Sequence, residues 1–181
     1  MTACFIGHRT VADVEQVCTK LYGALSALIA EGADTFLFGS RSDFDFLCWK
    51  TVTDMKEKYP HLKRVCFNAP HESAFTSKAE RQRYEQFLSQ RVNYEVHCAD
   101  YEKSVDSQKA LKANKNVYIM RNQEMIDSSD VCVFYYNKDY LPPKRKSSDI
   151  YLLEYQPKSG TAIAFAYAIR KKKQIINLYE G

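Results

Sequence analysis

The sequence predicts an α/β fold with an open, doubly wound and mostly parallel sheet of about six strands and helices on both faces. Two observations lead to this prediction. Short apolar runs alternate along the chain with longer amphipathic segments, as expected of repeated strand–helix–strand units. Several of these runs are apolar at every position, which is typical of strands whose sheet is covered on both faces by helices.

The first half of the chain follows this pattern clearly. Apolar residues at helical spacing from Val14 to Leu28 predict the first helix, and Gly32 ends it. Pro60 stands just beyond the second helix, because proline cannot continue a helix. The elements expected in this half are the strands Thr2–Gly7, Thr35–Phe38 and Leu62–Phe67 and the helices Val11–Glu31 and Phe44–Tyr59.

The second half contains one long irregular stretch, Asn137–Lys158, which includes two consecutive prolines. Loops of this length inside a compact domain are often functional, so we expect an insertion or lid at about 137–158. The elements expected in this half are the strands Tyr94–Cys98, Val131–Tyr135 and Gln174–Leu178 and the helices Lys78–Gln90, Val105–Ser128 and Thr161–Lys172. The whole pattern indicates a Rossmann-like sheet, in which ligands bind beyond the carboxyl ends of the strands.

Length and composition limit the class of protein. The 181 residues suit a single domain, residues 1–181, and 45% hydrophobic residues are ordinary for a globular chain. No apolar run is long enough to span a bilayer, and the N-terminus lacks the features of a signal peptide, so we expect a cytoplasmic protein. The six cysteines lack the C-x-x-C spacing of zinc or redox motifs, and the four histidines lack ligand spacing, so we predict reduced thiols and no metal.

The positive charge is concentrated in one segment. The net charge is only +4, but residues 138–173 hold nine basic and three acidic residues, so this segment is +6 and the rest of the chain is −2. Such a run is usually a solvated surface. It also suits a phosphorylated ligand, whereas the modest net charge does not indicate a nucleic-acid-binding protein.

Four motifs could bind an anion at the carboxyl edge of the sheet. Gly7-His8-Arg9 follows the first strand and combines a glycine, a titratable ring and an arginine suited to phosphate or carboxylate. The segment from Gly39 through Ser40 and Arg41 to Asp45 follows the second strand and begins a helix. The plainer interpretations are a turn with a surface arginine for the first motif, and a helix cap at Ser42 or Asp43 for the second.

The other two motifs lie later in the chain. Ser159-Gly160-Thr161, preceded by a lysine, begins an alanine-rich helix and is the strongest local candidate for a phosphate site, although a simple helix cap would look the same. Arg121-Asn122 lies in a helix before the fifth strand, and Arg121 could bind phosphate or form a surface ion pair with Glu124. Neither a dinucleotide fingerprint nor a P-loop is present.

Together these motifs resemble the SLOG superfamily. The strand followed by Gly-Ser-Arg-Ser-x-x-Asp resembles a segment of the Smf/DprA proteins, and Arg121-Asn122-x-x-Met125, a strand and Ser159-Gly160-Thr161 follow the order seen in the LOG phosphoribohydrolases. The initial Gly-x-Arg and Ile126-Asp127-Ser128-Ser129-Asp130 resemble the YpsA-like branch of bacterial proteins. The resemblance implies a nucleotide or nucleotide-sugar ligand held by these loops, such as ADP-ribose, NAD or a nucleoside monophosphate, with no required cofactor.

Three functions remain open. The first is a sensor or binding protein for a nucleotide derivative, in which Asp45 or Glu124 contacts ribose and Tyr135 or Tyr136 stacks on a base. The second is an N-glycosidic-bond hydrolase or transferase; the LOG enzymes place a catalytic glutamate shortly after Gly-Thr, where this chain has Ala162, Ile163 and Ala164, so a carboxylate would have to come from elsewhere. The candidates for that carboxylate are Glu72, Glu124 and Asp45. The third is a recombination-mediator-like DNA binder. The resemblance also allows a homo-oligomer.

Overall fold

The computed structural model describes residues 1–39, 42–68, 100–104, 117–142 and 158–180. Its strands are β1 (Thr2–Gly7), β2 (Thr35–Phe38), β3 (Lys63–Asn68), β4 (Tyr101–Ser104), β5 (Val131–Tyr135) and β6 (Gln174–Asn177). Its helices are α1 (Val14–Ala30), α2 (Asp43–Lys58), α5 (Val117–Asp127) and α6 (Gly160–Arg170). Within these ranges, no helix is long and apolar enough to cross a membrane.

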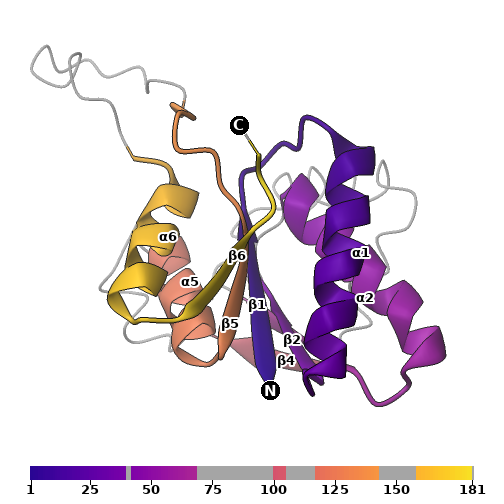
Figure 1. Cartoon of the computed structure of the whole chain (residues 1–181). Helices are drawn as coiled ribbons and strands as arrows, with labels where there is room; N and C mark the ends of the chain where they lie inside the picture. Colours follow the sequence, from indigo (N-terminus) through magenta and orange to yellow (C-terminus); the bar gives the residue numbers. More distant parts are fainter. Residues whose placement is uncertain (40–41, 69–99, 105–116, 143–157, 181) are drawn as a thin grey trace, which may run out of the picture.

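The strands form one six-stranded sheet in the order β4-β3-β2-β1-β5-β6. Every neighbouring pair is parallel, so the predicted α/β fold with a parallel sheet of about six strands is confirmed. Helices α1 and α2 cover one face and α5 and α6 cover the other, as Figure 1 shows. Strand β1 lies between β2 and β5, and the chain changes sides of β1 between them. This is the topological switch point, where open α/β sheets bind ligands.

Each face of the sheet buries its own core. Alternate residues of β1 point to opposite faces. Phe5 packs with α1 and α2 in one cluster, while Cys4 and Ile6 pack with α5 and α6 in the other. Both faces of β5 are likewise covered, and all five of its residues are buried. The prediction that continuous apolar runs are strands covered by helices on both faces is therefore confirmed for β1 and β5.

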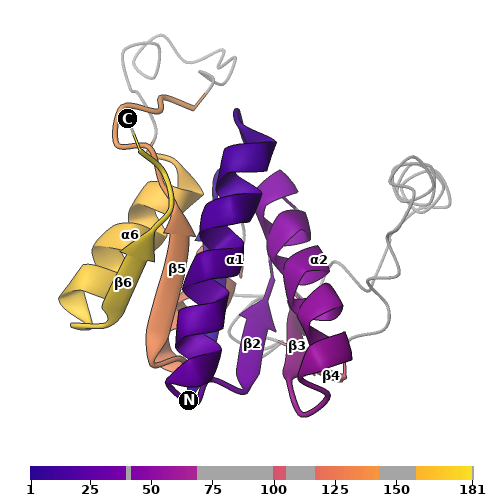
Figure 2. The same ribbon diagram turned by 45° about the vertical axis from the view of Figure 1, so that its right-hand side comes forward.

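Side-chain caps begin the helices close to the predicted residues. Asp13, Ser42 and Ser159 each accept a hydrogen bond from the backbone N–H three residues later, at the starts of α1, α2 and α6. Gly32 follows α1 with a φ of 95°, a conformation that favours glycine, so its predicted role in ending the helix is confirmed. Figure 2 shows α1 and α2 side by side along the sheet.

The later elements differ more from prediction. The expected helix Lys78–Gln90 and strand Tyr94–Cys98 lie outside the described residues, as does the first part of the helix expected at Val105–Ser128. The structure also contains a strand that was not predicted, Tyr101–Ser104, which includes a glutamate and a lysine and so has no apolar pattern. Its place comes from pairing with β3.

Only some of the alanines in α6 pack against the sheet. Ala164 and Ala168 are buried against the sheet, whereas Ala162 and Ala166 line a surface pocket. Alanines at alternate positions cannot all face the sheet, because a helix turns by about 100° per residue.

Candidate functional site

The loops after β1 and β2 meet at the carboxyl edge of the sheet. The backbone N–H of Asp43 donates to the carbonyl of Arg9 at 2.8 Å, which joins the two loops directly. Gly7 lies against the start of α2: a side-chain Cβ at this position would stand 2.7 Å from the Cβ of Phe44. Only glycine allows this approach. Arg9 itself is exposed, so its guanidinium faces solvent at the switch point.

Gly39 holds the second loop together. Its N–H donates to Oδ1 of Asp45 at 3.3 Å, and a Cβ at this glycine would lie 3.1 Å from both Cδ and Nε of Arg121. The predicted residues Gly39, Asp45 and Arg121 are therefore close together, although they come from β2, α2 and α5. Ser40 and Arg41, predicted to lie in the same loop, are outside the described residues.

Arg121 is buried, with 3% of its surface exposed. The alternative of a surface ion pair between Arg121 and Glu124 is therefore wrong, because one partner is not on the surface. The guanidinium carbon lies 5.2 Å from the centre of the Tyr118 ring. Asn122 beside it is also buried, and its Oδ1 has no hydrogen-bond partner among the described residues. A buried amide oxygen without a partner is expensive, so Asn122 is a candidate for ligand binding.

The Ser159-Gly160-Thr161 motif forms the N-terminus of α6. The Ser159 hydroxyl accepts from the N–H of Ala162 at 3.0 Å, so the helix-cap interpretation is confirmed for this side chain. Gly160 is exposed, and a Cβ added there would meet no described atom within 4 Å. Thr161 is buried. The exposed part of this motif is therefore the backbone at Gly160, with the exposed Lys158 close by in the chain.

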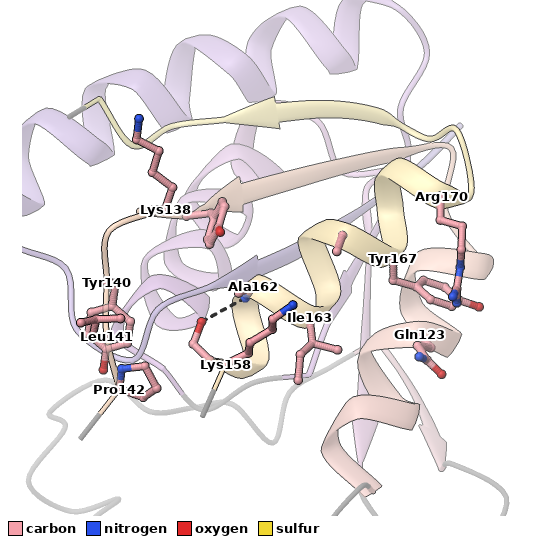
Figure 3. Close-up of a pocket in the computed structure, with 13 residues that line it drawn as sticks. Gln123, Lys138, Tyr140, Leu141, Pro142, Lys158, Ala162, Ile163, Tyr167 and Arg170 are labelled. Carbon is pink, nitrogen blue, oxygen red and sulfur yellow. Dashed lines mark hydrogen bonds between the residues drawn. The ribbon is translucent and has the colours of Figure 1, made fainter. Parts of the chain in front are cut away.

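A pocket of about 560 Å³ lies between α6 and the loop that follows β5 (Figure 3). Tyr140, Leu141 and Pro142 stand at one end of the pocket, and Tyr167 and Arg170 at the other. Its described lining is Gln123, Tyr136, Lys138, Tyr140, Leu141, Pro142, Lys158, Ser159, Ala162, Ile163, Ala166, Tyr167 and Arg170. Three of these residues are basic and none is acidic, so this lining favours an anion.

His8 connects the switch point to the pocket. Its ring is buried, and Nε2 lies 2.9 Å from the backbone N of Asn137, which donates to it. The ring centre lies 4.4 Å from that of Tyr140 and 5.8 Å from that of Tyr136, and both tyrosines line the pocket. Burial lowers the pKa of His8, although the carbonyl of Asn137 partly raises it. Nε2 of His8 therefore makes its hydrogen bond within the protein.

The two consecutive tyrosines at the end of β5, Tyr135 and Tyr136, have different surroundings. Tyr135 belongs to the core, where its ring stacks on Phe44 and its hydroxyl accepts from the N–H of Ala12 at 3.3 Å. Tyr136 is half-buried at the pocket and packs against Phe165. Of the two proposed base-stacking residues, only Tyr136 lines the pocket.

Some candidates are not brought into this arrangement. Glu72 and residues 143–157 of the expected lid lie outside the described residues. Glu124 is half-buried on α5, where its neighbour Gln123 lines the pocket instead. Sequence reasoning did not identify Tyr140, Leu141, Tyr167 or Arg170 as pocket residues. Two of them, Tyr140 and Leu141, are large apolar residues next to two prolines, and this exposed pair could have indicated a binding surface. No group of residues that could hold a metal occurs in the described ranges.

Comparison with known proteins adds one match. The family model described as "YspA SLOG family" matches residues 8–168, from the end of β1 to the last buried alanine of α6. The matched range contains all the candidate and pocket residues described above except Gly7 and Arg170. A search of curated proteins finds no match. Because the match covers most of the chain, this protein belongs to the YspA SLOG family.

Proposed function

We propose that this protein binds a nucleotide or nucleotide-derived ligand, of the ADP-ribose or NAD kind, as a sensor or binding protein. The observation that carries the proposal is the charge of the pocket beside the switch point. Lys158 and Arg170 lie along α6 on the pocket's side, Lys138 lies at its rim with its side chain pointing away from α6 (Figure 3), and the described lining contains no carboxylate. The volume of about 560 Å³ falls within the usual range for small ligands, roughly 300–1,000 Å³.

The composition of the pocket also suits the two parts of a nucleotide. Lys158 and Ser159 line the pocket beside the N-terminus of α6, and this favours a phosphate because helix N-termini attract anions. Tyr136, Tyr140 and Tyr167 offer aromatic surface to a base or ribose. The residues after Gly160-Thr161 are alanine and isoleucine, and both Ala162 and Ile163 line the pocket. This wall supports binding more than glycosidic-bond hydrolysis, which needs a carboxylate.

Thermal unfolding with a ligand panel tests the proposal. ADP-ribose, NAD and AMP are compared with adenosine and inorganic phosphate. A ligand present at about 100 times its Kd adds about 2.7 kcal/mol of stability, which should raise the Tm by roughly 5–10 °C. No shift with any phosphorylated nucleoside would refute the proposal. Chromatography of the same samples checks for released base, and its appearance would favour a glycosidase instead.

A matched pair of glycine variants locates the ligand. Gly160→Ala and Gly23→Ala each add a methyl group that meets no described atom within 4 Å, and both glycines are exposed in helices. Both variants should therefore fold. If a phosphate binds the backbone of α6, the methyl at Gly160 obstructs it and ADP-ribose affinity falls about tenfold or more, roughly 1.4 kcal/mol. Gly23→Ala should bind normally. Equal affinities for the two variants would show that no phosphate binds at the N-terminus of this helix.

Charge variants complete the test. Lys158→Ala removes a cation from the pocket, and Lys50→Ala removes an exposed cation from α2 on the other face of the sheet. Only Lys158→Ala should weaken binding, and the loss should be larger at low salt because exposed charges are screened. If both variants weaken binding equally, the effect comes from overall charge and the pocket is not the site.

A further inference from the structure

The turn that follows β5 is held in place by His8. Asn137 is the centre of this turn: its side-chain oxygen accepts from the N–H of Asp139 at 2.8 Å, and its carbonyl accepts from the N–H of Tyr140 at 3.3 Å. The N–H of Asn137 points instead at Nε2 of His8, at 2.9 Å. The N–H of His8 donates to the carbonyl of Tyr135 at 3.1 Å, so β1 and β5 are also joined at this level.

This contact determines the protonation state of His8. A backbone N–H can only donate, so Nε2 must accept and must carry a lone pair. The ring is then neutral, with its proton on Nδ1. The Tyr140 ring at 4.4 Å covers the histidine from the turn, and only 4% of His8 is exposed. Both the hydrogen bond and the ring contact would have to be rebuilt if the ring gained a proton.

The side chains that face the ring carry no charge. Tyr135 and Tyr136 face it from β5 and the residue after it, and Tyr140 faces it from the turn. The charged residues nearest in the chain, Arg9, Lys138 and Asp139, are exposed. A protonated Nε2 would oppose the Asn137 N–H, and the nearest acceptor is the Asn137 carbonyl at 3.3 Å. Protonation therefore exchanges a good hydrogen bond for repulsion, unless the turn moves.

We propose that His8 is a positioning residue: its neutral ring holds the turn of residues 137–140 as a wall of the pocket, and protonation of His8 releases that wall and weakens ligand binding. The turn carries Lys138 and Tyr140, which line the pocket and follow Tyr136 in the chain. The control of the turn stands independently, whereas its effect on binding rests on the proposed function. The lowered pKa of His8, caused mainly by burial, agrees with a ring that stays neutral near pH 7.

NMR spectroscopy of the free protein tests whether His8 holds the turn of residues 137–140. The ring ¹⁵N shifts of His8 should report the Nδ1–H tautomer, and the amide signal of Asn137 should titrate with the same midpoint as the ring, below the ordinary value of about 6.5. His8→Gln places an acceptor near the Nε2 position but does not titrate, so its Asn137 amide should stay constant with pH. His8→Phe keeps a ring without an acceptor, and its Asn137 amide should resemble the acidic wild type at every pH.

Calorimetric titration with ADP-ribose tests whether protonation of His8 weakens ligand binding. The wild-type Kd should rise roughly five- to tenfold between about pH 7.5 and a pH about one unit below the His8 midpoint found by NMR, as expected for one lost hydrogen bond, while His8→Gln should show no such step. The charge of the ADP-ribose diphosphate does not change over this range, so the ligand does not supply the effect.

The outcomes separate the two claims. An Asn137 amide that ignores the titration of His8 in the wild type overturns the inference, and this measurement needs no variant to fold. Binding without a pH step, or a step that persists in His8→Gln, overturns it as well. If the amide titrates as expected but ADP-ribose binds at no pH, the proposed function fails and the control of the turn by His8 is upheld.

Discussion

Replacing Gly7 by alanine should destabilise the protein through one steric contact. The new methyl carbon would lie 2.7 Å from the Cβ of Phe44 and 2.5 Å from its Cγ. Carbon atoms normally approach to about 3.5–4.0 Å, so roughly 1 Å of movement is required. Phe44 cannot simply rotate away, because its Cβ is attached to the backbone of α2. Its ring is also fully buried and stacks on Tyr135 with 5.7 Å between the ring centres.

The movement must therefore come from the start of α2. Overpacking of this kind typically costs 1–3 kcal/mol, and the short distance to a backbone-linked atom places Gly7→Ala at about 3 kcal/mol. For a chain of this length the Tm should fall by roughly 6–12 °C. Because Asp43 in the same turn donates to the Arg9 carbonyl, ligand binding at the switch point should weaken as well.

Urea denaturation with a constant m-value measures this loss, with thermal unfolding as a second readout. Gly23→Ala is the control, since its methyl group meets no described atom within 4 Å; it should leave stability unchanged or raise it by up to about 1 kcal/mol. If the unfolding free energy of Gly7→Ala lies within about 0.5 kcal/mol of the wild type, the close approach of β1 and α2 is not real and the steric argument fails.

Two further changes test the packing around the sheet. Hydrogen bonds from Arg64 and Lys56 outweigh the effect of burial and lower the pKa of Asp100 to about 2. This carboxylate therefore contributes up to about 2 kcal/mol above its unfolded pKa of 3.8, and loses it as the pH falls through about 2. Asp100→Asn should show that loss at pH 7 and approach the wild type near pH 2; a constant difference across an acid denaturation series would contradict this. Ser42→Ala removes the acceptor for the Asp45 N–H and should cost about 1 kcal/mol in urea denaturation. An unchanged midpoint there would mean that the cap is not needed.

The elements that could be predicted from the sequence are those whose own residues require burial. Strands Thr2–Gly7, Thr35–Phe38 and Val131–Tyr135 were predicted with their observed ends, because continuous apolar runs can only be satisfied between two helical layers. Tyr101–Ser104 was missed, because an edge strand with a glutamate and a lysine owes its position to backbone pairing with β3.

The candidate site could be predicted in part for a similar reason. The loops after parallel strands necessarily gather at one edge, so Gly7, Arg9 and Gly39 were expected to lie together there. The burial of Arg121 could not be predicted, because a helix pattern does not show how deeply a polar side chain sits beneath a neighbouring loop. The pocket along α6 also depends on where the turn after β5 rests.

The amino-acid order alone was enough to determine a parallel α/β sheet, its first strands and helices, and the loops that carry polar groups. These properties follow from local rules of periodicity, capping and chain direction. Which polar group serves a ligand and which serves the fold was decided by contacts between distant segments. Asp45 binds the Gly39 backbone, Ser159 caps its own helix, and His8 holds a turn that lies 129 residues away in the chain. Such roles arise only when folding brings a donor and an acceptor within about 3 Å, and no local pattern records that distance.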